Sequence, residues 1–174
     1  MEYGTAFALA VAGDSSRAEA AANDLGKRFP EDTSVRFSYV PALRARIALN
    51  RGGPAKAIEQ LQIAGPYELG NPRSALNGFF GAMYPVYVRG EAYLAERQGA
   101  EAAVEFQKIL NHRGLVASDS IGALASLQSG RAYVLSGETA KPRSAYQDFL
   151  TLWKDADPDI PILKQAKAEY ARLQ

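Results

Sequence analysis

Four pairs of small residues recur along this chain at one spacing, and they constrain its fold more than any other feature. The two members of each pair lie twelve residues apart, and they are Ala6 and Ala18, Ala45 and Ala57, Gly90 and Ala102, and Gly130 and Pro142. A glycine-containing break separates the members of each pair, at Gly13-Asp14, Gly52-Gly53-Pro54, Gly99 and Gly137-Glu138. Small residues on both sides of a turn let two antiparallel helices approach closely. The pattern therefore predicts a train of helical hairpins.

The remaining apolar residues support the same prediction. The second helices are expected over residues 15–28, 54–64, 100–111 and 139–154, and each is followed by a proline or glycine that ends a helix. Two further apolar positions repeat in register within them, at Ala22, Leu61, Phe106 and Tyr146 and at Leu25, Ala64, Ile109 and Phe149. No Asn-Gly or Asp-Gly turn lies between alternating apolar strands. The predicted fold class is all-α.

This register resembles the tetratricopeptide repeat (TPR). The third and fourth units match it best, through Gly90, Tyr93, Ala102 and Phe106 and through Gly130, Tyr133 and Tyr146. The resemblance implies a single domain over 1–174, a right-handed solenoid of about four TPR-like helical hairpins with a C-terminal capping helix. The expected units span about 1–32, 33–70, 83–116 and 117–156, and the capping helix spans 159–173. Spacings of 39, 45 and 40 residues between units predict longer connections than the family has.

Two segments depart from the repeat. The connection Gly65–Pro85 interrupts the periodicity and contains Phe79 and Phe80, which either plug the seam between hairpins or form a partner-binding loop. Thr139 and Asp159 are the expected N-caps of the last two helices. The final helix is expected to turn Ile160, Leu163, Ala166, Tyr170 and Leu173 inward and to leave Lys164, Gln165, Lys167 and Glu169 in water.

The composition excludes most catalytic and cofactor chemistry. The chain has no cysteine and one histidine, His112, and its 20 basic and 19 acidic residues leave a net charge of +1. No phosphate-binding glycine motif or nucleophile elbow occurs. The Asp155–Asp159 run lacks the glycine and glutamate of a calcium loop. Glu59, Glu101 and Glu105 are expected on solvated helix faces. We therefore expect no enzyme activity, no cofactor, no metal site and no binding of nucleic acid or membrane by this segment.

The resemblance does imply a candidate partner-binding groove. The family's groove positions correspond here to Tyr39, Arg46, Tyr84, Tyr87, Glu91 and Arg131, and Tyr and Arg both suit protein recognition. The residues with which some relatives clamp a C-terminal carboxylate are replaced by Tyr3, Phe7, Leu43, Tyr84 and Val88, so that clamp is not carried over. The alternative is that the groove residues only pack against the next hairpin or the last helix.

The last two units contain the stretches YPVYVRGEAYLA, EFQKILNHRG, GRAYVLSG and AYQDFLTLWKDADPDIPILKQAKAEY. Through these stretches they also resemble the C-terminal repeat region of bacterial eukaryotic-like serine/threonine protein kinases and winged-helix transcriptional regulators. This resemblance implies a fragment of a longer, multidomain, cytoplasmic signalling protein, in which the segment is a non-catalytic interaction or regulatory module for a protein or peptide partner. The first alternative is a structural spacer or homodimerisation element. A third reading is a helical enzyme or small-molecule sensor that uses the 65–85 insertion as a lid.

Overall fold

The computed structural model describes residues 2–70, 81 and 83–173, and every regular element within these ranges is helical. The predicted all-α class is therefore confirmed. The α-helices are α1 (Glu2–Val11), α2 (Ser15–Arg28), α3 (Val40–Asn50), α4 (Pro54–Leu61), α5 (Tyr84–Ala95), α6 (Gly99–Asn111), α7 (Arg113–Val116), α8 (Ile121–Leu135), α9 (Lys141–Leu152) and α10 (Pro161–Ala171). A π-helical turn, η1 (Val35–Tyr39), leads into α3, and a 3₁₀ turn, η2 (Gln62–Tyr67), follows α4.

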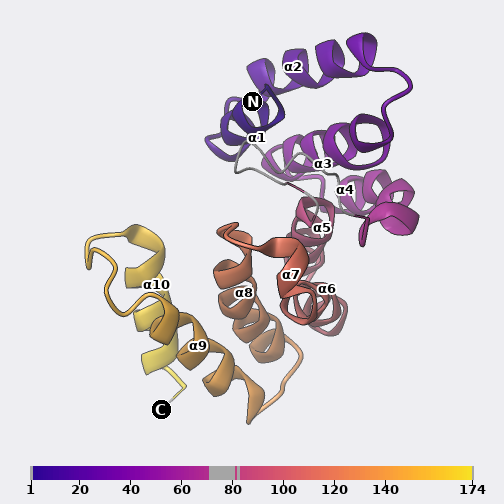
Figure 1. The fold of residues 1–174 in the computed structure, drawn as a ribbon. Helices are drawn as coiled ribbons and strands as arrows, with labels where there is room; N and C mark the ends of the chain where they lie inside the picture. The colour runs from indigo at the N-terminus through magenta and orange to yellow at the C-terminus, as the bar shows by residue number, and fades with distance from the viewer. Residues whose placement is uncertain (1, 71–80, 82, 174) are drawn as a thin grey trace.

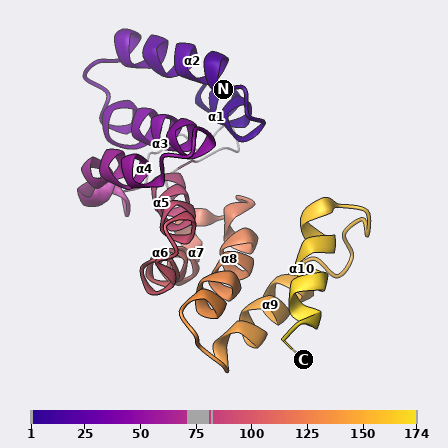
Figure 2. The same ribbon diagram turned by 180° about the vertical axis from the view of Figure 1, so that it is seen from behind.

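The helices pack in consecutive pairs that follow one another along an arc. The pairs are α1/α2, α3/α4, α5/α6 and α8/α9, and the second helix of each of the first three pairs also packs against the first helix of the next pair. In both views the second helices lie on the outer side of the arc, while α1, α3, α5, α8 and α10 lie on its inner side (Figures 1 and 2). We call this inner side the inner face.

The same turn closes all four pairs. Its residue with positive φ stands seven places after the small residue of the first helix, at Gly13, Gly52, Arg97 and Gly137. The next backbone N–H then donates to the carbonyl five residues earlier, at 2.8–3.0 Å, which is a Schellman closure of the first helix. The sequence predicts the third break at Gly99, but Arg97 takes the left-handed conformation at this turn. Gly99 begins α6 instead, where an added Cβ would lie 2.7 Å from the Ala132 carbonyl oxygen of α8.

The predicted small residues lie where the paired helices approach each other. Ala6, Ala18, Ala45, Ala57 and Ala102 are buried, as are Gly90, Gly130 and Pro142. A Cβ added to Gly90 would lie 2.6 Å from the Phe106 ring, and one added to Gly130 would lie 2.8 Å from the Tyr146 ring. The rings therefore take the volume that the glycines leave open. In the first two pairs smaller partners, Ala22 and Leu61, are buried at the corresponding position opposite alanine.

Two expected helix starts are wrong. Helix α9 begins at Lys141 after Ala140 rather than after Thr139, and α10 begins at Pro161 after Ile160 rather than after Asp159. In both helices a proline in the first turn sets the backbone, and neither preceding residue makes a side-chain cap. Within the described ranges, none of the helices combines the length and apolarity that crossing a lipid bilayer requires.

The glycine contacts give a stability prediction. Gly90→Ala places a methyl group against a buried ring and should lower the free energy of unfolding by about 1–3 kcal/mol. Gly26→Ala is the matched control, because Gly26 lies inside α2 with nothing within 4 Å of an added Cβ. It should raise stability by about 0.5–1 kcal/mol. Urea denaturation measures both, and equal effects of the two substitutions would contradict the assigned packing.

Candidate functional site

The inner face carries charged side chains at one repeated position, directly after the small residue of successive first helices. Arg46 of α3, Glu91 of α5 and Arg131 of α8 occupy it, and Glu169, which follows Ala168 in α10, extends the row. The charges alternate in sign along the arc. We call these four residues the charge ladder.

Direct and bridged hydrogen bonds join the ladder across three helices. Arg46 Nη1 donates to Glu91 Oε2 at 2.9 Å. Gln128 of α8 connects the next two members, because its Nε2 lies 3.5 Å from Glu91 Oε1 and its Oε1 accepts from Arg131 Nη1 at 3.2 Å. The ladder thus holds α3, α5 and α8 in one register.

The last step of the ladder is a two-pronged ion pair. Arg131 donates from Nε to Glu169 Oε2 and from Nη2 to Glu169 Oε1, both at 2.9 Å. The Tyr146 hydroxyl of α9 donates to the same Oε2 at 2.8 Å. Glu169 was expected to stay in water, and this expectation is wrong because the carboxylate accepts three hydrogen bonds from α8 and α9.

The two ladder carboxylates respond differently to their surroundings. Burial raises the pKa of Glu91, and the opposing attraction of Arg46 does not fully compensate. Burial also works against ionisation of Glu169, but hydrogen bonds from Arg131 and Tyr146 outweigh it, so its pKa lies below the ordinary value. The Glu169 carboxylate is thus the more firmly ionised of the two.

The structure separates the six predicted groove residues into two groups. Arg46, Glu91 and Arg131 come together in the ladder, and about a quarter of each side chain stays exposed (22–24%). These three can contact a partner. The aromatic members, Tyr39, Tyr84 and Tyr87, are largely taken up by packing.

Each tyrosine has a partner within the chain. Tyr39 stacks on Tyr3 with ring centroids 4.1 Å apart. The buried Tyr84 donates its hydroxyl to Asp119 Oδ1 at 2.8 Å, and the buried Tyr87 hydroxyl accepts from Gln128 Nε2 at 3.3 Å. Sequence reasoning missed Asp119 and Gln128, since neither stands at a position that the repeat pattern marks.

A second ionic group lies inside the stack and was not anticipated. Arg89 of α5 is buried, and it pairs with Glu68 after η2 and with Glu105 of α6, the latter at 2.6 Å. Lys108 of α6 also reaches Glu68, at 3.0 Å. We call these four residues the buried ionic cluster. It joins α5 and α6 to the segment that follows α4.

The expectation that Glu105 lies on a solvated face is wrong, because this carboxylate is buried against Arg89. One signal in the sequence could have revealed the cluster. Arg89 stands between Val88 and Gly90 in a helix whose only other charged residue is Glu91, and a buried cation requires a partner of opposite charge. The pattern does not say which carboxylate supplies it.

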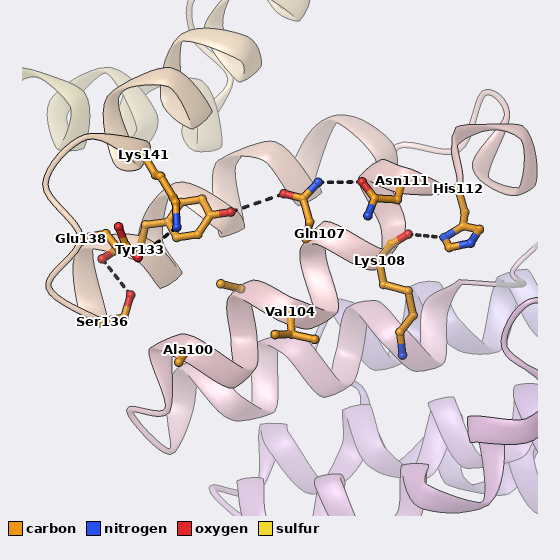
Figure 3. Close-up of a pocket in the computed structure, with 11 residues that line it drawn as sticks. Ala100, Val104, Gln107, Lys108, Asn111, His112, Tyr133, Ser136, Glu138 and Lys141 are labelled. Atoms are coloured by element: carbon orange, nitrogen blue, oxygen red, sulfur yellow. Dashed lines mark hydrogen bonds and ion pairs between the residues drawn. The ribbon is translucent and has the colours of Figure 1, made fainter.

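An open hollow of about 640 Å³ lies on the outer side, between α6 and the turn from α8 to α9. Ala100 and Val104 form part of its apolar lining (Figure 3). Its amide and hydroxyl groups bond to one another, with the Tyr133 hydroxyl donating to Gln107 Oε1 at 3.4 Å and Gln107 Nε2 donating to Asn111 Oδ1 at 2.9 Å. The hollow therefore offers a shallow surface rather than converging polar groups.

The described residues contain no group of three or more histidine, cysteine, aspartate or glutamate side chains arranged to hold a metal ion. His112 ends α6 with its Nδ1 2.7 Å from the Lys108 carbonyl oxygen. Phe79 and Phe80 of the predicted plug or loop lie outside the described residues. The chain matches no protein-family model, and no curated protein or solved structure matches it.

Removing the buried arginine should destabilise the protein, because it leaves buried carboxylates without a partner. Arg89→Met leaves Glu68 and Glu105 without their main partner and should lower stability by about 3–5 kcal/mol. Arg51→Met is the matched control, since Arg51 pairs with Glu19 on an exposed surface and such pairs contribute about 0–1 kcal/mol. Chemical denaturation measures both. If Arg89→Met does not fold, Arg89→Lys provides the test, because it retains the charge and its loss of stability should lie between those of the other two variants. A loss of stability for Arg89→Met no larger than that for Arg51→Met would contradict the role of the cluster.

The cluster also predicts how stability depends on pH. Burial raises the pKa of Glu68, but bonds from Arg89 and Lys108 outweigh this, so the pKa falls below 4.5. A lowered native pKa gives stability that is present above the ordinary value and lost as pH falls through the native one. The stability difference between the protein and Glu68→Gln should therefore be full at pH 7 and shrink below pH 4.5. Glu101→Gln, on the exposed face of α6, controls for loss of a carboxylate. A stability difference between the protein and Glu68→Gln that grows below pH 4.5 would refute the lowered pKa of Glu68.

Proposed function

We propose that this chain is a TPR-like, right-handed solenoid that serves as a non-catalytic interaction module and binds a peptide or protein partner along its inner face. The proposal is supported by four helix pairs that share one turn and one register of small residues. The resemblance in the last two units favours a regulatory role within a multidomain signalling protein.

The observation that carries the proposal is the row of partly exposed charges at equivalent positions along the inner face. Arg46, Glu91 and Arg131 lie on adjacent first helices, and packed helices lie about 8–10 Å apart. A peptide in the polyproline II conformation advances about 9 Å in three residues, which is one full turn, so every third side chain lies on the same face. A segment that crosses the helices would therefore bring every third side chain opposite one ladder charge. Partners with acidic and basic residues alternating at that interval are the best match.

A second candidate is a structural spacer or homodimerisation element. The internal pairing of the ladder charges and the packing of the groove tyrosines favour it, because both would hold the array rigid without any ligand. Sedimentation at increasing protein concentration separates a dimerising element from a monomeric module.

Reversing the whole ladder distinguishes a binding face from a spacer. The fourfold variant Arg46→Glu, Glu91→Arg, Arg131→Glu and Glu169→Arg keeps each neighbouring pair opposite in charge but presents the inverted order to a partner. If the inner face binds a partner, the fourfold variant should keep most of the wild-type thermal stability. When immobilised, it should no longer retain the proteins that the immobilised wild-type chain retains, and quantitative mass spectrometry measures these proteins. The exposed outer-side variant Lys56→Glu in α4 should retain them. Unchanged retention by the fourfold variant would rule out the inner face and leave the spacer.

A further inference from the structure

Helix α10 is attached to the rest of the molecule by a small set of contacts of its own. Its two buried residues, Leu163 and Ala166, belong to an apolar cluster with Leu127 of α8 and with Tyr146 and Phe149 of α9, which is distinct from the larger core although Leu124 packs against both. Its main packing partner is α9. In both ribbon views α10 lies beside α9 at the end of the arc (Figures 1 and 2). It can therefore open without disturbing the main core.

The surface beneath α10 is a ready-made receptor for a carboxylate. Arg131 presents its guanidinium edge with two donors, and Tyr146 adds a third, so each Glu169 oxygen accepts at least one hydrogen bond. Fork-like pairing of this kind is geometrically selective and stronger than bonds between neutral groups. All three donors come from α8 and α9, and none comes from α10.

The residues of α10 that contact this surface follow a simple sequence pattern. Leu163, Ala166 and Glu169 follow at intervals of three residues, which places them along one side of α10. The leucine and alanine fill the apolar cluster, and the glutamate reaches the receptor. Lys164, Gln165 and Lys167 are exposed. The side of α10 that contacts α8 and α9 therefore has the sequence pattern Leu-x-x-Ala-x-x-Glu.

The connection from α9 to α10 is irregular and largely exposed. Between Trp153 and Ile160 the chain is not regularly helical, and Lys154, Asp155, Asp157, Pro158 and Asp159 are exposed. The hydrogen bonds within this stretch are short-range, such as that from the Asp159 backbone N–H to Asp157 Oδ1 at 2.8 Å. Trp153, Ala156 and Ile160 are partly buried against the same apolar cluster as α10, so these contacts would loosen together with the helix.

We propose that the α8–α9 surface is a docking site for an amphipathic partner helix with the pattern Leu-x-x-Ala-x-x-Glu, and that α10 is the resident ligand that such a helix replaces. This inference rests on the proposed function, because it names one class of partner for the module. Charge complementarity selects the occupant, because the Glu169 carboxylate accepts from the two Arg131 donors and from the Tyr146 hydroxyl together. The tethered α10 acts at millimolar effective concentration, so it keeps the site closed to weak competitors.

The experiment uses a fluorescent peptide of residues 159–173 as the probe and the full chain as the receptor. Leu163→Asp with Glu169→Ala in the chain should release its own α10. Anisotropy should then show the peptide binding this opened chain at least about tenfold more tightly than wild type, because the site is no longer occupied. Adding Arg131→Met should remove that gain. A peptide carrying Glu169→Gln should bind the opened chain about tenfold more weakly.

Controls separate the possible failures. Lys167→Ala on the exposed side of α10 should bind the peptide as wild type does, and circular dichroism should show that the opened chain keeps the helices of the main core. Equal peptide binding by wild-type and opened chains, or a gain that survives Arg131→Met, would overturn the docking site. If that happened while the wild-type chain still retained proteins that the reversed ladder loses, the inner-face function would stand without the α10 site.

Discussion

The close contact between a side-chain-free backbone and an aromatic ring organises the two best-matching helix pairs. Gly90 lies against Phe106 and Gly130 against Tyr146 so closely that a single methyl group would collide. This close approach fixes where each first helix must end along its axis. The shared Schellman closure ends the helix there, with its positive-φ residue seven places after the small residue. Packing and turn therefore reinforce one another, and together they fix which side chains reach the inner face.

Local repetition explains how much of this could be predicted from the sequence. The small residues, the buried second-helix positions and most helix ends follow from steric rules that act within about twenty residues, and the structure has them where expected. Pairings between distant residues are different. Glu105 and Glu169 look solvated in their own helices, and only the stacking of pairs brings Arg89 and Arg131 to them. Arg97 was missed for another reason, because sequence favours glycine at positive φ whereas the turn tolerates arginine there.

The two ionic groups have different consequences for the molecule. The buried ionic cluster lies within the main stack and joins the segment after α4 to α5 and α6, so its role is to hold the third pair to what precedes it. The charge ladder lies on the inner face and stays partly in water. Each of its bonds therefore competes with water, and under the proposed function it would compete with a partner's charges as well.

The alternation of the ladder limits how such an array can change in length. Positive and negative members follow one another from α3 to α10, so loss of the third pair alone would set Arg46 against Arg131, and duplication of the second, third or fourth pair would likewise place equal charges side by side. Adding or removing two pairs restores the order. Alternation along the ladder is therefore preserved when two adjacent pairs are gained or lost together, and it is broken when the third or fourth pair alone is.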